Sequence, residues 1–256
     1  MIKILENPTD FYELNKKSWS DNASYWLEQD FYRFGLSNFL LQKITKILPN
    51  FNHIPHIVDI GCGSGWLLDA LLANKLSFSY SGIDYNETFI EHLQIRHNET
   101  INFKFLQIDI EKDNFDNLSN IDIAICCLSL IEITDLDGFF RKISSKMNDN
   151  AIIIIVGLDP TTEIIRYALD DLDLQQIANY YRKSDKPVYI SKKFITKNRH
   201  SKSEYFRILY SISDYNLYAK KYGFGIYKVN VDFNKKSTKA DAPVFQIISY
   251  VKKIEK

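Results

Sequence analysis

Short apolar runs alternate with helical patterns over the middle of the chain. Strands are predicted where β-branched and aromatic residues cluster, over 56–60, 78–83, 103–108, 121–127 and 151–156. Helices are predicted where apolar residues recur at helical spacing, over 64–74 with Ser64 as the cap, 87–98 and 135–147. Because the strand runs lack polar alternation, each strand is expected to be buried on both faces of a parallel sheet. The pattern therefore predicts a doubly wound α/β fold.

The two ends of the chain lie outside this alternation. Residues 1–50 are predicted to form aromatic-rich helices that end near Pro49. Later elements are a long helix over 161–182, an irregular basic stretch to His200, a helix over 213–222 stopped by Gly223, and strands over 225–231 and 243–251. We expect one domain, with a helical N-terminal cover (1–50), a core (51–158), an insertion or lid (159–206), and a closing helix and strands (207–256).

Composition supports a compact globule and limits its partners. The chain has 256 residues, of which 45% are hydrophobic, and its 32 basic residues balance 32 acidic ones. No net positive field favours nucleic acid or an anionic membrane, so such affinity would need a local patch. The longest apolar runs, such as 151–158, are far shorter than the roughly 20 residues that cross a bilayer. The first ten residues lack the apolar stretch of a signal peptide, so we expect a cytoplasmic protein.

Cysteine and histidine give little sign of disulfides or metal. The three cysteines, Cys62, Cys126 and Cys127, are odd in number and include an adjacent pair, which argues against a disulfide framework. We expect them to pack as small hydrophobic residues near strand ends. The five histidines show no HxxxH or HExxH spacing, so no metal site is expected.

A glycine-rich turn follows the first predicted core strand, in the sequence Val58-Asp-Ile-Gly-Cys-Gly-Ser-Gly65. Three glycines there let the backbone turn sharply and approach a ligand more closely than a Cβ would permit. The dinucleotide pattern GxGxxG would need glycine at position 66, where this chain has Trp66, so NAD and FAD are disfavoured. The P-loop pattern GxxxxGK[ST] is absent as well.

Acidic residues recur at three successive strand ends. Asp59 precedes the first glycine of the turn, Asp84 ends the second strand, and Asp109 follows the third. Asp84 is placed to accept hydrogen bonds from ribose hydroxyls. Asp109 can accept from an adenine amino group, and Ile110 can pack on the ring. Taken singly, Asp59 could be a turn or capping residue and Asp84 an Asx-turn acid, but together the three acids indicate nucleoside binding.

These motifs resemble those of class I, Rossmann-like S-adenosylmethionine-dependent methyltransferases of the small-molecule type, over roughly residues 55–160. The resemblance implies a seven-stranded sheet whose last strand is antiparallel. It also implies that Asp59, Gly61 and Gly63 line the methionine end of S-adenosylmethionine, Asp84 and Tyr85 the ribose and adenine, Asp109 and Ile110 the adenine, and Cys127 the methionine side. Cys62 of the same turn is expected among the cofactor-binding residues. Trp19, Ala23 and Tyr25 resemble a W-x-x-x-A-x-Y segment that precedes the core in many small-molecule members, which adds Tyr25 to the expected cofactor-binding residues.

The catalytic base is less clearly marked. A hydroxyl or ammonium acceptor must lose a proton, so a base within hydrogen-bond reach would contribute. Glu132 is the first candidate, because the loop after the fourth strand faces the transferred methyl in the resembling family. The alternative is that Glu132 is a favourable acid in the first turn of the next helix. Tyr12, Tyr25, His200 and Tyr205 are weaker candidates for the base.

The predicted insertion carries a local positive charge. Nine Lys or Arg lie between Tyr181 and Arg207, against Asp185 and Glu204. Such a patch could attract a small substrate bearing a carboxylate or phosphate, or could contact RNA. It could equally be a solvated cover balanced by nearby aspartates, and no RNA-binding module motif accompanies it.

The sequence thus predicts a S-adenosylmethionine-dependent methyltransferase that modifies oxygen or nitrogen of a small organic molecule. We expect the acceptor to be enclosed by the N-terminal helices and the 159–206 insertion, with no membrane partner and with nucleic acid disfavoured. The alternatives are a tRNA or RNA methyltransferase using the basic 182–207 segment, and a cofactor-binding protein without catalysis. The sequence leaves the acceptor and the oligomeric state open.

Overall fold

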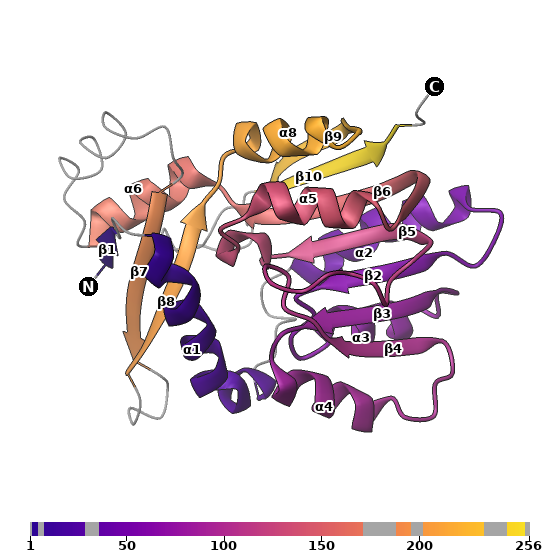
Figure 1. Ribbon diagram of the computed structural model, residues 1–256, viewed down its shortest axis with the longest axis horizontal. Helices are drawn as coiled ribbons and strands as arrows, with labels where there is room; N and C mark the ends of the chain where they lie inside the picture. The colour runs from indigo at the N-terminus through magenta and orange to yellow at the C-terminus, as the bar shows by residue number, and fades with distance from the viewer. Residues whose placement is uncertain are drawn as a thin grey trace.

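The structure is a computed structural model, and it describes residues 2–4, 8–28, 36–170, 188–195, 202–232 and 245–253. Within them, seven strands form one sheet in the order β4-β3-β2-β5-β6-β10-β9 (Figure 1). The strands are β2 (His56–Ile60), β3 (Ser79–Asp84), β4 (Phe103–Gln107), β5 (Ile121–Cys127), β6 (Met147–Leu158), β9 (Phe224–Asp232) and β10 (Phe245–Lys252). The expected doubly wound sheet is confirmed.

Strand directions also follow the expectation. The five strands from β4 to β6 are mutually parallel, and β10 is antiparallel to both β6 and β9. Because β10 is the last strand in the chain, the sheet has the antiparallel last strand that was predicted. All parallel strands therefore end at one edge of the sheet, where ligands bind in open α/β folds.

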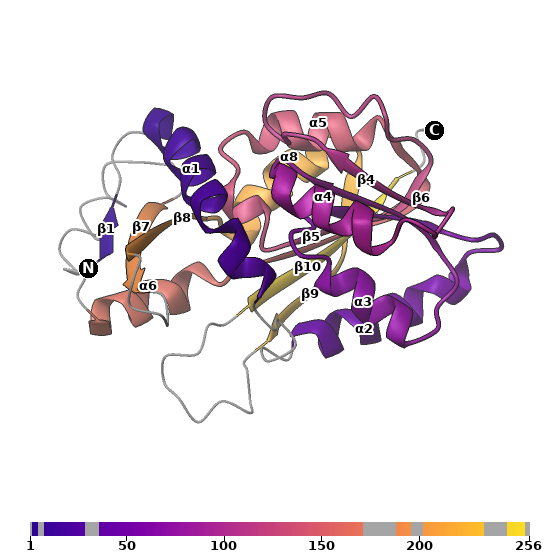
Figure 2. The ribbon, with the colours of Figure 1, turned by 90° about the horizontal axis from the view of Figure 1, so that it is seen from below.

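Two apolar layers cover the sheet. Side chains alternate along β6, so that Ile153 and Ile155 join one cluster while Ile152 and Ile154 join the other. The first layer contains α5 (Leu136–Ser144) and α8 (Ile212–Lys221), and the second contains α2 (Leu36–Ile47), α3 (Trp66–Ala73) and α4 (Glu87–Arg96). Figure 2 shows α5 and α8 on one side of the sheet and α2 and α3 on the other. Burial on both faces explains the continuous apolar strands.

Several predicted elements need correction. Ser64 does not cap α3, because the turn places Gly65 at the N-cap with φ of 79° and no side-chain cap. The stretch predicted as irregular up to His200 contains β7 (Val188–Ile195), and β8 (Lys202–Leu209) follows where no element was predicted; the two strands pair antiparallel in a small sheet of order β1-β7-β8. Aromatic and β-branched residues between the lysines account for these strands. β1 (Ile2–Ile4) was also not predicted.

The remaining terminal elements agree more closely. The N-terminal segment contains α1 (Pro8–Leu27), α2 and a 3₁₀ turn η2 (Leu48–Asn50), and α8 is followed by Gly223 with φ of 84°. The helix predicted over 161–182 begins as α6 (Pro160–Asp170), and its remainder, 171–182, lies outside the described residues.

Helix α1 packs on the small sheet. Phe11 is fully buried, with its ring edge-on to Tyr189 at 5.4 Å and to Phe206 at 6.1 Å between centroids. Ser18 Oγ donates a hydrogen bond to the Glu204 carbonyl. In Figure 1, α1, β7 and β8 lie beside the ends of the large sheet's parallel strands. Helix α1 and strands β7 and β8 therefore lie together at the edge where a ligand is expected.

Candidate functional site

A cavity of about 420 Å³ opens at the carboxyl edge of the sheet. Its walls come from the turn after β2, the ends of β3, β4 and β5, and the overlying α1 and β8. Most residues expected to bind a nucleoside cofactor border it, namely Gly61, Cys62, Gly63, Asp84, Tyr85, Asp109, Ile110 and Cys127. Glu132, the candidate base, borders it as well.

The glycine turn forms the floor of the cavity. Gly61 and Gly63 have φ of 72° and 51°, which L residues with side chains rarely adopt. The amides of Gly61 and Cys62 both donate to the Ile83 carbonyl, at 2.8 and 3.0 Å, and so fasten the turn to β3. A Cβ on Gly61 would lie 2.5 Å from Ser129 Cβ, whereas a Cβ on Gly63 would meet nothing within 4 Å. Gly63 thus leaves open space into which a ligand can approach the backbone.

Asp84 ends β3 beside this turn. Its Oδ2 accepts from the Gly63 amide at 3.0 Å and its Oδ1 from the Asn86 amide at 2.9 Å. Burial raises the pKa of Asp84 to about 6, against the lowering effect of these backbone donors. Since a carboxylate offers about four acceptor positions, Asp84 can still accept two further hydrogen bonds. A ribose diol would supply that pair of donors.

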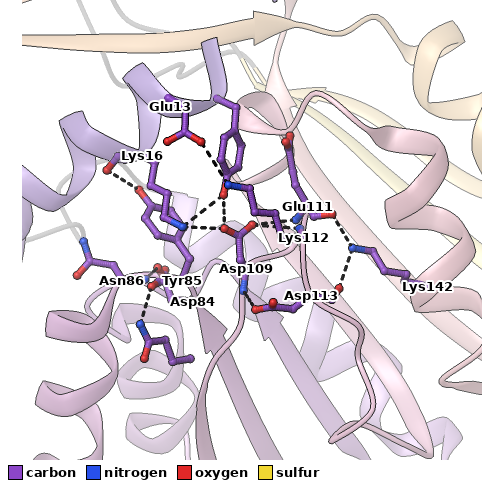
Figure 3. Close-up of polar contacts among 12 residues, drawn as sticks. Glu13, Lys16, Asp84, Tyr85, Asn86, Asp109, Glu111, Lys112, Asp113 and Lys142 are labelled. Atoms are coloured by element: carbon purple, nitrogen blue, oxygen red, sulfur yellow. Dashed lines mark hydrogen bonds and ion pairs between the residues drawn. The ribbon is translucent and has the colours of Figure 1, made fainter. Parts of the chain in front are cut away.

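Asp109, after β4, is held by residues of α1. Lys16 Nζ lies 2.9 Å from Asp109 Oδ2, and the Tyr12 hydroxyl donates to the same oxygen. Figure 3 shows Lys16 and Glu13 reaching from α1 toward Asp109 and Lys112, and Lys112 Nζ lies 3.2 Å from Glu13 Oε1. Burial opposes ionisation, but the donors from Tyr12 and Lys16 hold the pKa of Asp109 below its ordinary value.

The backbone after Asp109 is fixed from the other side by α5. Lys142 Nζ donates to the carbonyls of Ile110, Glu111 and Asp113, the last two at 3.2 and 2.9 Å. Glu111 also accepts from Thr134 Oγ1 at 3.0 Å. The segment that carries Asp109 and Ile110 is therefore positioned before a ligand arrives.

Glu132 lies in a 3₁₀ turn, η3 (Leu130–Glu132), between β5 and α5. Its Oε2 accepts from Asn15 Nδ2 at 3.2 Å. Burial raises the pKa of Glu132 to about 8, although Asn15 and the charge of Arg207 act to lower it. Helix α5 begins later, at Leu136, and is capped by Asp135. Glu132 is thus outside the first turn of α5, and its side chain borders the cavity instead.

Two expected cofactor-binding residues do not border the cavity. Asp59 is 3% exposed and accepts from the Tyr80 hydroxyl at 2.8 Å, and burial raises its pKa to about 7. Tyr25 packs edge-on against Trp26, with 5.3 Å between ring centroids. The Asp59 carboxylate is therefore engaged by Tyr80 of β3 instead of lining the cavity. Trp26, rather than Tyr25, borders the cavity.

The three cysteines are free thiols. Cys62 and Cys126 are buried and Cys127 is half-buried. Burial raises the pKa of each thiol well above its ordinary value, which disfavours the thiolate needed for thiol chemistry.

The lining residues that sequence reasoning did not assign to the site include Asn15, Lys16, Trp26, Ser129 and Arg207. Tyr12, Asn15, Lys16 and Trp19 recur at helical spacing, so this face of α1 was visible in principle. The face that turns toward the ligand, however, depends on how α1 docks. Arg207 was counted only as part of the basic segment, whose other basic side chains, like His200 and the Tyr205 side chain, lie outside the described part.

The described residues show neither a metal site nor a membrane-spanning helix. No group of three or more histidine, cysteine or acidic residues among them is arranged to hold a metal ion. No helix in the described part is both long and apolar enough to span a bilayer.

Comparison with known proteins agrees with this geometry. Residues 57–150 match the family model described as "Methyltransferase domain". The protein named "Putative methyltransferase 235L" of Invertebrate iridescent virus 6 is 28% identical over 136 residues, which cover 53% of this chain and 47% of the viral protein. The chain thus spans about half the length of this curated relative.

Solved structures resemble nearly the whole chain. A S-adenosylmethionine-dependent methyltransferase from Clostridium acetobutylicum ATCC 824 has a TM-score of 0.60 and 17% identity, covering 94% of this chain and 99% of that one. The CcbJ methyltransferase from Streptomyces caelestis has a TM-score of 0.61 and 10% identity, covering 93% of this chain and 98% of that one. The N-methyltransferase NodS from Bradyrhizobium japonicum WM9 has a TM-score of 0.57 and 10% identity, covering 94% of this chain and 98% of that one. At such identities the likeness shows the fold.

The protein therefore has the Rossmann-like fold of class I S-adenosylmethionine-dependent methyltransferases. Residues 57–150, which match the methyltransferase-domain model, carry the glycine turn and the acidic strand ends.

Proposed function

We propose that this chain is a S-adenosylmethionine-dependent methyltransferase that acts on nitrogen or oxygen of a small organic molecule. The observation that supports it best is the convergence of Asp84, Asp109 and the glycine turn on one cavity. The whole chain, 1–256, then works as one domain, with 51–158 binding the cofactor and 1–50 and 159–206 covering the acceptor.

The residues present fit this cofactor. Asp84 has acceptor positions left for two ribose hydroxyls, and the open space at Gly63 admits a ligand against the backbone. Asp109 can accept from the adenine amino group in place of Lys16 or Tyr12, with Ile110 packing on the ring. Tyr85, Cys62 and Cys127 complete the contact surface, and Gly61 carries the turn. Asp59 and Tyr25 act indirectly, Asp59 through its hydrogen bond with Tyr80 and Tyr25 through its packing against Trp26.

S-adenosylmethionine, when bound, supplies a methyl group on a positively charged sulfur. The chain's main contribution is then to hold the acceptor in line with that group, because correct orientation removes much of the entropic barrier. Glu132 accepts the proton that the acceptor loses, since its raised pKa lies near working pH. The cover of α1 and β8 excludes bulk water from the reaction.

The experiment that tests this function has two parts. Isothermal titration calorimetry of the purified chain with S-adenosylmethionine should show binding at one site. Incubation with small-molecule extracts should then produce S-adenosylhomocysteine and one compound heavier by one methyl group. A folded protein that does not bind the cofactor would contradict the proposal, and binding without product in any extract would favour a non-catalytic protein.

The partner and location follow from the same proposal. A cavity of about 420 Å³ suits a small acceptor better than a nucleic acid, and we place the protein in the cytoplasm. Transfer to RNA would instead require binding to tRNA at low salt that weakens steeply as salt is added.

A further inference from the structure

Two buried oxygen atoms beside Glu132 have no hydrogen-bond partner among the described residues. They are Oδ1 of Asn15, a residue only 6% exposed, and Oγ of Ser129. Both residues border the cavity. Leaving a buried polar atom unpaired is unfavourable, so such atoms mark places where a ligand group is expected.

The contacts of Asn15 and Ser129 show which of their atoms remain without a hydrogen-bond partner in the described part of the chain. Asn15 donates through Nδ2 to Glu132 Oε2 at 3.2 Å, and this leaves Oδ1 as an acceptor. Ser129 packs against Gly61 of the glycine turn, and its carbonyl accepts from the Glu132 amide at 3.2 Å. Ser129 Oγ therefore lies beside the glycine turn, and the Asn15 amide lies beside the Glu132 carboxyl.

The charges that line the cavity favour a cationic ligand group. Its described lining contains four carboxylates, Asp84, Asp109, Glu111 and Glu132, and two basic side chains, Lys16 and Arg207. Lys16 is already paired with Asp109. Aromatic rings of Tyr12, Trp19, Trp26 and Tyr85 complete the walls. Carboxylates and aromatic faces favour a cation over an anion.

We propose that the methyl acceptor is an amine nitrogen, held by Asn15 Oδ1, Ser129 Oγ and the Glu132 carboxylate; this deepens the proposed function and rests on it. A hydroxyl brings one hydrogen to three oxygens, whereas an ammonium group brings three. After one proton passes to Glu132, the neutral amine keeps two N–H bonds for Asn15 and Ser129 and frees its lone pair.

The transfer step balances without another reactant. The nitrogen lone pair forms a bond to the methyl carbon while the carbon–sulfur bond breaks, and that electron pair stays on sulfur. The charge gained by nitrogen cancels the charge lost by sulfur. Asn15 and Ser129 orient the nitrogen throughout, and Glu132 holds the proton removed beforehand.

Sinefungin provides a probe that needs no knowledge of the acceptor. It carries a primary amine where S-adenosylmethionine carries the methylated sulfur, whereas S-adenosylhomocysteine has neither amine nor methyl there. Calorimetry should show that the wild-type chain binds sinefungin at least about tenfold more tightly than S-adenosylhomocysteine, since one charge-assisted hydrogen bond suffices for that ratio.

Substitutions should reduce this preference specifically. Asn15→Leu and Glu132→Gln should each bring the two affinities within about threefold, while binding of S-adenosylhomocysteine stays near the wild-type value. Asn22→Leu is the matched control, because Asn22 is also a buried asparagine of α1 but bonds to the Ser18 carbonyl and does not border the cavity. Ser129→Ala removes a single oxygen and gives a second test if Asn15→Leu does not fold.

The outcomes distinguish a failure of the amine assignment from a failure of the proposed function. If the preference for sinefungin is absent in the wild type, or is unchanged in the Asn15, Ser129 and Glu132 variants, the amine assignment is overturned. If neither compound binds the folded chain, the proposed function itself fails.

Discussion

Lys16 of α1 and Asp109 after β4 form an ion pair, with 2.9 Å between Nζ and Oδ2. The pair joins the N-terminal cover to the strand end expected to recognise adenine. The other oxygen of Asp109 accepts from the Glu111 amide at 3.1 Å, so both oxygens are engaged. An adenine amino group must therefore compete with Lys16 or Tyr12 for Asp109.

Replacing Lys16 should strengthen cofactor binding. Lys16→Met frees one acceptor position on Asp109, and because the lysine is partly exposed the gain should be about two- to fivefold. Calorimetry with S-adenosylhomocysteine at low and high salt measures it. Added salt weakens the ion pair, so it should raise affinity in the wild type and change little in the variant. Weaker binding by Lys16→Met would mean that the lysine contacts the cofactor directly.

Asp84 should be the strongest single determinant of cofactor affinity. Asp84→Ala should weaken binding of S-adenosylmethionine by about 1–3 kcal/mol, because the ribose hydroxyls lose a charged acceptor. Asp69→Ala serves as the control, since Asp69 pairs with Arg96 at 2.8 Å away from the cavity lining. Equal affinities of the wild type and Asp84→Ala for S-adenosylmethionine would contradict the placement of the ribose hydroxyls on Asp84.

Much of this site was predictable from sequence because its features are dictated by the backbone. A turn with two or more left-handed residues needs glycines, and acids at parallel strand ends necessarily meet at one edge. Asp84, Asp109 and Gly63 could therefore be placed from spacing alone.

The parts that sequence did not predict depend on tertiary docking. Nothing local tells which face of the aromatic α1 turns toward the ligand, so Asn15 and Lys16 were missed. The lysines around Tyr189 and Phe194 obscured the β7–β8 hairpin, whose stability comes from packing on Phe11 of α1. Asp59 matches the cofactor motif, yet its carboxylate bonds to Tyr80.

Glu132 should govern the pH dependence of turnover. Its carboxylate must be ionised to take a proton, and burial raises its pKa to about 8, so kcat should rise with pH and level off above about 8. Glu132→Gln should lower kcat by roughly 10²–10⁴-fold and abolish this rise, while cofactor affinity stays near normal. An unaltered profile in the variant would exclude Glu132 as the base.

Glu132 and Asp84 should make the ligand-free protein less stable as pH rises from about 4 to 8. Burial raises the pKa of Glu132 from 4.5 to about 8 and that of Asp84 from 3.8 to about 6, so the folded state holds protons more tightly than the unfolded state. The free energy of unfolding is then highest below the unfolded-state pKa values and falls as pH passes toward the folded-state values.

Glu132→Gln removes one of these titrations. The variant should be more stable than wild type at pH 8, by about 1–3 kcal/mol, and the difference should shrink toward pH 4. Urea denaturation at both pH values measures it. A variant that is no more stable than wild type at pH 8 would contradict the raised pKa assigned to Glu132.

Substitution of Gly61 should mainly destabilise the fold, whereas substitution of Gly63 should mainly weaken cofactor binding. Gly61→Ala places a Cβ 2.5 Å from Ser129 Cβ at a positive φ, so it should destabilise the fold by about 2 kcal/mol or more. Gly63→Ala meets no neighbour within 4 Å and should cost about 1 kcal/mol, while its methyl group fills the space needed by the cofactor. Thermal unfolding and calorimetry on both variants test this contrast, which would be refuted if Gly63→Ala bound the cofactor normally.

The central claim is that a nucleoside bearing the methyl donor lies along the strand ends after β2, β3 and β4. A crystal structure of the chain with S-adenosylhomocysteine tests it most directly. We expect the ribose hydroxyls on the Asp84 carboxylate, the adenine amino group on Asp109 with Ile110 against the ring, and the sulfur near Ser129 and Glu132. Density for the ligand at any other place, with Asp84 still bonded only to Gly63 and Asn86, would contradict the account.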